Sequence, residues 1–434
     1  MRDKRPNILF IFTDQQSLRA MGACGMPAHT PNMDALAASG VRFERSYCTS
    51  PVCSPARASL MTGRMPHEMG ARFNGCALSP DCRTIGHMFR DAGYETAYTG
   101  KWHLDHCVYY WAPVDRQGFE FLTFPEPPKS WLGRATDGPT ADQAIAFLKK
   151  PHEDPFLLVV SLHNPHDICY SIIEGTIQPR TAVEGPVLPS NLARDPNEPE
   201  FITECRNRRR YAAEMTLITD WSDDHWRGYL HAYSRIVEET DVQVGRIMDA
   251  LRNAGLEEDT LVVFTSDHGE GMASHNWVVK QMLYENPVSV PLIFRRPGVI
   301  DAGRVDQTHL ASGVDILPTL CDFAGVPVDP RVTGVSLRPV IGQSALPGQP
   351  YVVAELDPDP GEPAKTGRMV RTDRFKYVVF SHGSRREMFF DLESDPGEMH
   401  NLAANPEFED EIQRHRRLLN EWQQATQDTM LGVG

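Results

Sequence analysis

Two hydrophobic patterns alternate along the chain. Runs of consecutive apolar residues predict strands that are buried on both faces, and they lie at 6–14, 156–162 and 260–265. Apolar residues spaced by three or four positions predict helices, and this spacing occurs at 32–38, 84–92, 141–148, 223–253 and 315–323. Strands that alternate with helices favour an α/β fold with a large, mostly parallel central sheet flanked by helices.

The pattern changes near residues 341–350, where Gly, Pro, Gln and Ser predict a connection. Beyond it, a small antiparallel sheet with one helix is predicted from segments at 351–355, 367–371, 375–380, 387–390 and 407–424. The chain has 434 residues, which exceeds the roughly 250–300 that one hydrophobic core usually serves. We therefore predict a catalytic domain at 1–345 and a C-terminal antiparallel-sheet subdomain at 346–434.

The formal net charge of −15 disfavours nucleic acid or an anionic membrane as a partner. The apolar runs are strand-length, well short of the roughly 18 residues of a membrane-spanning helix. The first residues lack the pattern of a secretory signal, so the expected location is the cytoplasm, or the periplasm or exterior if a signal has been removed. With this charge, an enzyme for anionic esters needs a local cluster of cations.

Nine cysteines occur without a framework spacing, and an odd number argues against a disulfide scaffold. Cys76 and Cys82 are close enough in sequence to pair, but two free thiols are the favoured interpretation.

Acidic residues mark the ends of two predicted strands. Asp14 ends the first strand and is followed by Gln15, while Asp267 and His268 follow the strand at 260–265. Ligands in open α/β sheets bind beyond the carboxyl ends of the strands. One Asp at a strand end is more often a turn or cap residue, but two, each followed by a second potential ligand, favour a divalent cation.

A reactive side chain is predicted at a helix N-terminus in the segment 50–64. Cys53 shortly precedes Pro55, which suits a first helical turn, and good helix formers continue to residue 62. Backbone donors and the helix dipole favour negative charge there, and Arg57 lies one turn later on the same face. A nucleophile beside a fixed cation suits displacement at an anionic centre.

The sequence resembles a known family in this segment. Cys-Ser-Pro-Ala-Arg at 53–57, with Thr-Gly-Arg at 62–64, is similar to the signature of formylglycine-dependent type I sulfatases, members of the alkaline phosphatase superfamily. Further similar elements, in the family's order, are Asn-Ile-Leu-Phe-Ile-Phe-Thr-Asp-Gln at 7–15, Gly-Lys-Trp-His at 100–103, His-Asn-Pro-His at 163–166, Ser-Asp-His-Gly at 266–269 and Phe-Phe-Asp-Leu at 389–392. Matches in this order over nearly the whole length are far more specific than the signature alone.

The resemblance implies an alkaline-phosphatase-like sandwich and a residue role at each matching position. A formylglycine-generating enzyme would oxidise Cys53 to formylglycine (3-oxoalanine), whose hydrate supplies the nucleophile. The implied ligands of Ca²⁺, with Mg²⁺ or Mn²⁺ as alternatives, are Asp14, Gln15, Cys53, Asp267 and His268. The implied catalytic residues are Cys53, Arg57, Lys101, His103, His166 and Lys280, and the implied substrate contacts are His163 and His275.

Each implied catalytic group has a task. Arg57 would steady the hydrate, and two lysines, Lys101 and Lys280, would hold the sulfate oxygens. His166 would protonate the leaving alcohol, and His103 would take a proton as sulfate leaves. A lone Lys or His is more often a surface or core residue, a reading that applies most to Lys280 and His275.

Three functions follow from the resemblance. The first is hydrolysis of a sulfate ester or sulfamate, with a sulfated saccharide as the favoured substrate because the segment 163–169 has some likeness to a heparan N-sulfatase element. The second is hydrolysis of a phosphonate or phosphate ester, since the combination of Gln15 and His268 resembles both the choline-sulfatase-like and the phosphonate monoester hydrolase branches of the superfamily. The third is non-catalytic binding of a sulfated ligand. The segment from 170 to about 210 is rich in Pro and Asn, which predicts an irregular segment that is a binding element or disordered. The arginine-rich run 206–210 at its end is interpreted as a solvated helix start or as a contact for an anionic substrate. The oligomeric state stays open.

Overall fold

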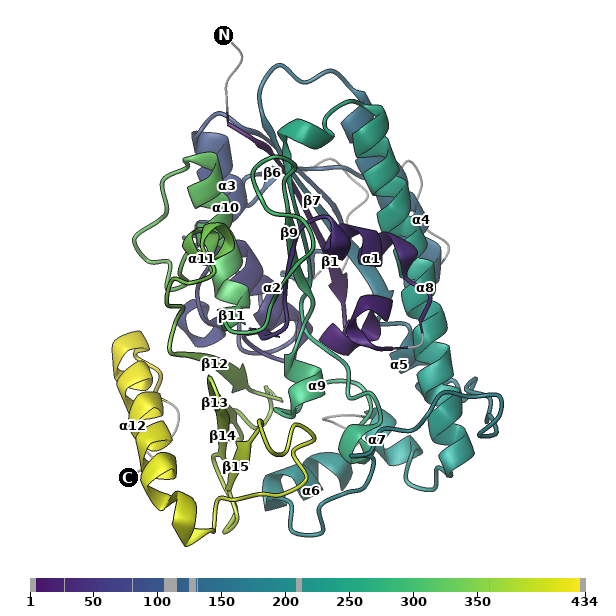
Figure 1. Cartoon of the computed structure of the whole chain (residues 1–434), viewed down its shortest axis with the longest axis vertical. Coiled ribbons are helices and arrows are strands. Elements are labelled where there is room, and N and C mark those ends of the chain that lie inside the picture. The colour runs from purple at the N-terminus through teal and green to yellow at the C-terminus, as the bar shows by residue number, and fades with distance from the viewer. Residues whose placement is uncertain are drawn as a thin grey trace.

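The structure is a computed structural model, shown in Figure 1. It describes residues 5–26, 28–79, 81–104, 115–124, 130, 132–207, 213–358 and 360–429. A large sheet with helices on both faces occupies most of the molecule, and the C-terminal residues form a smaller unit beside it (Figure 1).

Nine strands among the described residues form the central sheet, in the order β10-β2-β9-β8-β1-β7-β4-β6-β5. The central members β8, β1, β7 and β4 run parallel to one another, as do β6 next to β4 and β10 next to β2. Their bounds are β1 Asn7–Asp14, β2 Val41–Phe43, β4 Glu95–Gly100, β5 Asp115–Arg116, β6 Phe119–Phe121, β7 Phe156–Pro165, β8 Thr260–Ser266, β9 Leu292–Arg295 and β10 Arg304–Asp306. A separate short pair is formed by β3 Ser46–Tyr47 and β11 Ala311–Ser312.

Strand β1 is buried on both faces because side chains alternate across a strand. Phe10 and Phe12 belong to the core on one side of the sheet, and Leu9 and Ile11 to the core on the other side. The first core is covered by α2 Cys53–Thr62, α3 Ile85–Asp91, α10 Ile316–Ala324 and α11 Arg338–Gly342. The second is covered by α1 Pro31–Ala38, α4 Gly133–Lys149 and α8 Asp223–Asn253.

Helices also interrupt a stretch that its Pro- and Asn-rich composition predicts to be irregular, between residues 170 and 210. The structure has α5 Ile168–Ile173 and α6 Glu200–Asn207 there, followed by α7 Ala213–Leu217. The prediction was wrong for α5 and α6 because apolar residues such as Ile172, Phe201 and Ile202 are buried in a tertiary core.

The C-terminal unit is a four-stranded antiparallel sheet in the order β12-β13-β14-β15. Its strands are β12 Tyr351–Leu356, β13 Gly367–Thr372, β14 Phe375–Phe380 and β15 Glu387–Asp391, and the helix α12 Glu409–Thr426 packs on it. The predicted fold class is therefore confirmed. The predicted boundary between residues 345 and 346 falls between α11 and β12, and it stays a prediction.

A buried cation joins this sheet to the larger unit. The Nζ atom of Lys376 on β14 lies 2.7 Å from Glu398 Oε1 and 3.2 Å from Glu285 Oε2, on α9 Glu285–Val288. The Lys376 side chain is 0% exposed and that of Glu398 is 2% exposed. The Tyr47 hydroxyl donates to Glu285 and accepts from Arg371 Nε, which extends the network into β13.

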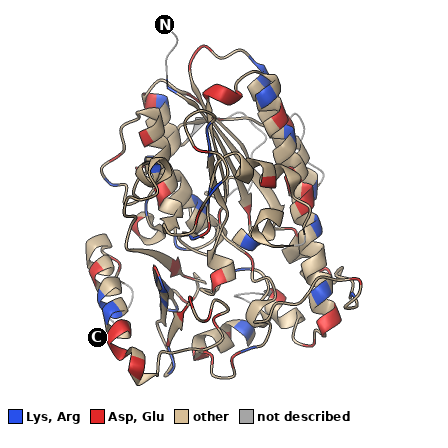
Figure 2. Ribbon diagram, viewed as in Figure 1, with Lys and Arg blue, Asp and Glu red and all other residues tan. Residues whose placement is uncertain are grey.

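Charges of both signs occur along the outer helices α8 and α12 (Figure 2). No helix among the described residues is long and apolar enough to cross a membrane. The eight described cysteines are free thiols, Cys76 and Cys82 among them as predicted, while Cys107 lies outside the described residues.

Replacement of Lys376 by methionine should strongly destabilise the protein, because Glu285 and Glu398 lose their buried cation. Removing one partner of a buried pair costs about 3–5 kcal/mol of unfolding free energy. Chemical denaturation of the variant measures this loss. Arg252→Met is the control, since the pair of Arg252 with Asp249 is exposed and worth about 0–1 kcal/mol. An equal loss in both variants would contradict the buried joint.

Candidate active site and metal centre

Four neighbouring strands deliver polar side chains to one edge of the sheet. Asp14 is the last residue of β1, Asp267 directly follows β8, Lys101 directly follows β4, and His163 lies near the end of β7. Because these strands are parallel, their carboxyl ends meet at the same edge, where ligands bind in open α/β sheets. All four side chains are buried.

Cys53 faces this edge from the first position of α2. Val52 before it is extended, which turns the chain into the helix at this point. The Cys53 Sγ atom lies 3.0 Å from Lys280 Nζ, 3.3 Å from His268 Nε2 and 3.7 Å from Asp14 Oδ1. Burial and Asp14 raise the pKa of the thiol, but Lys280, Lys101 and His268 outweigh them, so its pKa lies well below the usual range.

Arg57, one turn further along α2, holds the two strand-end carboxylates together. Its Nε atom donates to Asp267 Oδ2 at 2.8 Å, and its Nη2 atom donates to Asp14 Oδ2 at 2.8 Å. Its Nη1 atom donates to the Lys101 carbonyl at 2.6 Å and to Ser161 Oγ at 2.8 Å. The guanidinium thus fixes one group from each of four neighbouring strands or their ends in one buried arrangement.

Two lysines complete a local positive cluster within an acidic protein. Lys101 Nζ donates to Asp14 Oδ2 at 2.6 Å, and Lys280 Nζ donates to Gln15 Oε1 at 2.9 Å and contacts Cys53. Despite burial, which lowers it, the pKa of Lys280 is raised by the negative groups around it. The need for local cations set by the net charge of −15 is met by side chains that this edge of the sheet brings together.

The residues predicted to hold a metal ion form a compact group. One possible ligand atom from each of Asp14, Cys53, Asp267 and His268 lies within 4.8 Å of the others. The His268 Nδ1 atom lies 2.9 Å from the Gly269 carbonyl, to which it can only donate, so Nε2 keeps its lone pair toward the group. Carboxylate oxygens with one imidazole nitrogen fit a divalent cation.

Gln15 joins this group through a left-handed backbone conformation. Its φ angle of 73° turns the chain after Asp14, its N–H donates to Asp267 Oδ1 at 3.1 Å, and its carbonyl accepts from the Tyr233 hydroxyl.

The carboxyl groups of Asp14 and Asp267 have pKa values that are shifted in opposite directions. Burial favours the neutral form of both, but Lys101 holds the pKa of Asp14 well below its usual range, while burial and the Asp14 charge raise that of Asp267 to about 6.

Three predicted histidines surround the cluster. Burial and the nearby Lys280 and Lys101 lower the pKa of His166 to about 4. Burial also lowers the pKa values of His103 and His163, and the ring of His163 lies 4.9 Å from that of His166. Nδ1 of His103 and Nδ1 of His166 are buried without a hydrogen-bond partner among the residues that the structure describes. Neutral imidazoles with such atoms can exchange protons with a bound molecule.

His275 has different surroundings. Its ring stacks on Tyr284 at a centroid distance of 4.0 Å, and it lines a cavity of about 430 Å³ whose lining does not include Cys53. Its role as a substrate contact stays a prediction. Arg206, from the arginine-rich run, is buried against Glu198 and fits neither reading of that run, and Arg208 to Arg210 lie outside the described residues.

Two buried carboxyl groups near the site were missed by the sequence analysis. Glu270 accepts a hydrogen bond from Gln15 Nε2, and Asp137 on α4 accepts from the N–H groups of His163 and Asn164 at 2.6 and 2.9 Å. Burial raises the pKa of Asp137 to about 7. The acidic residue directly after Asp-His-Gly is a usable signal for Glu270. Asp137 has no comparable signal, because only the tertiary fold brings it to β7.

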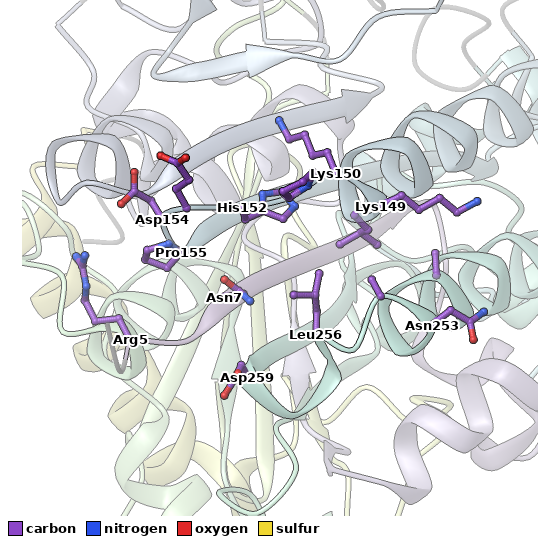
Figure 3. A pocket seen from close by; sticks show the side chains of 15 residues that line it. Arg5, Asn7, Lys149, Lys150, His152, Asp154, Pro155, Asn253, Leu256 and Asp259 are labelled. Atoms are coloured by element: carbon purple, nitrogen blue, oxygen red, sulfur yellow. The ribbon is translucent and has the colours of Figure 1, made fainter. Parts of the chain in front are cut away.

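A cavity of about 960 Å³ lies at the opposite, amino-terminal edge of the sheet (Figure 3). It is lined by residues at the starts of β1, β7 and β8, among them Asn7, Pro155 and Asp259. Lys150 and His152 in its wall are both paired with Glu95. We assign no chemistry to this cavity, since the reactive side chains gather at the other edge.

Comparisons with known proteins agree with this geometry. A family model described as Sulfatase matches residues 6–326, and a model described as N-sulphoglucosamine sulphohydrolase, C-terminal, matches residues 273–425. A Delta 4,5-hexuronate-2-O-sulfatase of Bacteroides thetaiotaomicron is 33% identical over 445 residues, which cover 98% of this chain and 90% of that protein.

Solved structures are similar over the whole chain. A 2-O GAG sulfatase has a TM-score of 0.85 at 31% identity, covering 98% of this chain and 93% of that one. A protein in complex with its substrate D-glucosamine-2-N,6-O-disulfate has a TM-score of 0.78 at 26% identity, covering 98% and 99%. The predicted family resemblance and fold are confirmed.

The raised pKa of Asp137 predicts a pH-dependent stability. A carboxyl group whose pKa is higher in the folded protein stabilises when protonated, and this contribution is lost as pH rises from the unfolded value of 3.8 through about 7. Between pH 5 and pH 7 the loss amounts to about 2–3 kcal/mol. Urea denaturation at both pH values should show this loss in the wild type and a smaller one in Asp137→Asn, where position 137 does not titrate. The same pH dependence in both proteins would refute the assignment.

Proposed function

The chain belongs to the sulfatase family and is a sulfuric ester hydrolase, and from this premise we propose that it removes sulfate from a sulfated carbohydrate. The nucleophile is residue 53, after Cys53 has been oxidised to formylglycine. One observation carries this proposal: Cys53, at the start of a helix, lies within 3.7 Å of a lysine, a histidine and a carboxylate. An isolated structural cysteine has no need of these neighbours.

The substrate class is argued from the relatives and from charge. The Delta 4,5-hexuronate-2-O-sulfatase and the complex with D-glucosamine-2-N,6-O-disulfate both concern sulfated sugars. Lys101 and Lys280 offer two cations beside Cys53 for the oxygens of a sulfate ester or sulfamate. Which sugar is held is decided by loops around the edge of the sheet.

We call the cluster of Asp14, Cys53, Asp267 and His268 the acidic group. A divalent cation is proposed there, held by Asp14, Gln15, Asp267, His268 and an oxygen of residue 53. Ca²⁺ is our first choice because four of these five ligands offer hard oxygen atoms, and Mg²⁺ and Mn²⁺ fit the same donor types. When bound, the cation supplies Lewis-acid stabilisation of negative charge at the reacting group. Arg57 holds two of these proposed ligands, Asp14 and Asp267, in position.

The hydrate of formylglycine would supply a hydroxyl group as nucleophile at position 53. Lys101 and Lys280 bind the sulfate oxygens and stabilise the charge that develops on them. His166 donates a proton to the leaving oxygen of the substrate as its bond to sulfur breaks. His103 then takes the proton of the second hydroxyl of the hydrate, so that sulfate is expelled and the aldehyde at position 53 is restored. Cys53 is among the groups that shift the pKa values of both histidines, which supports their assignment to this reaction.

The lowered pKa of His166 needs an explanation if this residue acts as an acid. Burial, Lys280 and Lys101 lower its pKa to about 4 in the protein without substrate. A bound sulfate ester adds negative charge between these cations and the ring, which opposes the lowering. His103, whose pKa is also lowered, is already in the neutral form that a base requires.

The proposed maturation requires a formylglycine-generating enzyme, which reads the Cys-x-Pro-x-Arg segment before folding. In the folded protein Cys53 is 1% exposed, so an enzyme could not reach it there. Conversion therefore precedes burial of α2 against the sheet.

Matured protein should release sulfate from sulfated saccharides and lose this activity in Cys53→Ala. Cys48→Ala is the matched control, because Cys48 is also buried and lies in the same segment but is not joined to the acidic group. Removal of a nucleophile from such a site costs several orders of magnitude in kcat. Unchanged activity in Cys53→Ala would refute the mechanism, and a much higher rate on a phenylphosphonate monoester than on any sulfate ester would favour the phosphonate hydrolase.

Chelation should remove both activity and part of the thermal stability. A ligand at 100 times its Kd stabilises a folded protein by about 2.7 kcal/mol, so added Ca²⁺ should raise the Tm of the stripped protein. The rise should be largely absent in Asp267→Asn, which loses a charged ligand. Calorimetry in the presence of Ca²⁺, Mg²⁺ or Mn²⁺ identifies the preferred ion. Full activity after complete removal of metal would contradict this part of the proposal.

A further inference from the structure

Three hydrogen-bond donors converge on the buried carboxylate of Glu270. The Tyr229 hydroxyl and the Val279 N–H both donate to its Oε1 atom, while Gln15 Nε2 donates to its Oε2 atom at 2.5 Å. The Glu270 side chain is fully buried and lies two residues after His268. The two oxygens thus bind different parts of the structure. Oε1 accepts from Tyr229 on α8 and from Val279 in the loop after β8, and Oε2 accepts from Gln15.

The backbone of Gln15 is fixed, so only its side-chain amide has a choice of orientation. Its N–H is bound to Asp267 and its carbonyl to Tyr233. On one side of the amide lies the Glu270 carboxylate, which only accepts, and on the other lies the Lys280 ammonium, which only donates, 2.9 Å from Gln15 Oε1. Together these neighbours allow one orientation, with Nε2 toward Glu270 and Oε1 toward Lys280, whose Nζ atom also contacts Cys53.

We propose that Glu270 is a positioning residue that fixes the amide of Gln15 so that its oxygen faces the metal ion. The inference rests on the proposed function, in which Gln15 is a metal ligand. A flipped amide would present an NH₂ group to a cation, which neither coordinates nor attracts it. Cys169, whose Sγ atom lies 3.2 Å from Nε2 and 3.4 Å from Oε1, contacts both ends of the amide and cannot select one.

Glu270→Gln tests this role with little other change. The side-chain oxygen can stay with Tyr229 and Val279, while the new NH₂ group takes the place of Oε2 and faces the NH₂ group of Gln15. Two donors repel in this orientation, and after a flip the Gln15 NH₂ group would face the Lys280 ammonium instead, so neither orientation is held and the Gln15 oxygen is no longer fixed toward the ion. We expect the Kd for Ca²⁺, measured by calorimetry on metal-stripped protein, to rise about 10–100-fold, the usual effect of losing a partner of a metal ligand. The Tm of the stripped protein should change little.

Two further variants separate positioning from packing. Tyr229→Phe removes a bond to Oε1 but leaves the bond to Gln15, so its Kd for Ca²⁺ should change much less than that of Glu270→Gln. The exchanged pair Gln15→Glu with Glu270→Gln restores complementarity, since the amide now donates from position 270 and position 15 offers an oxygen to the ion. Its Kd should recover most of the loss.

The outcomes identify which claim fails. If Gln15→Ala leaves the Kd for Ca²⁺ unchanged, Gln15 is not a ligand, and the ligand set of the proposed function is wrong. If Gln15→Ala weakens binding but Glu270→Gln does not, the positioning role is wrong and the ligand set stands. A weakening in Glu270→Gln that the exchanged pair does not restore, together with a lower Tm of the stripped protein, shows a packing role and also overturns the proposal.

Discussion

The buried guanidinium of Arg57 is the interaction on which the rest of the site depends. Two carboxylates, Asp14 and Asp267, are brought to the same edge by adjacent parallel strands, where their charges repel and burial favours their neutral forms. Arg57, 1% exposed, donates to both and also to the carbonyl at the end of β4. It offsets this repulsion, and its planar fork fixes the two carboxylates relative to each other.

The same helix, α2, supplies both Arg57, which holds the two carboxylates, and the reactive residue 53. Cys53 begins α2 and Arg57 follows one turn later, so the geometry that ties α2 to the sheet also aims residue 53 at the acidic group. Lys280 comes from a loop after β8 in which several non-glycine residues have positive φ angles, Val279 among them. Such a backbone is held only by dense tertiary contacts, and the Glu270 carboxylate is one of them. The loop therefore adopts unfavourable backbone conformations, and this backbone fixes the Lys280 ammonium beside Cys53.

The local part of this site could be predicted from the sequence, because it rests on short-range rules. A strand end fixes Asp14, a helical repeat fixes Arg57 relative to Cys53, and the family resemblance adds the lysines and histidines at their positions. The rest depends on contacts between distant segments. Asp137 reaches β7 only through the packing of α4. The amphipathic helix α6 was not predicted because it lies in a segment whose composition is typical of loops.

The central claim is that Cys53 becomes the aldehyde precursor of the nucleophile. It is tested most directly by the mass of the tryptic peptide 46–57 from protein produced together with a formylglycine-generating enzyme. The peptide also contains Cys48, which has no part in the acidic group and serves as an internal standard. Our account predicts that Cys53 alone is converted and that an aldehyde-specific reagent labels position 53. A peptide in which both cysteines remain thiols, from protein that nevertheless hydrolyses sulfate esters, would contradict it.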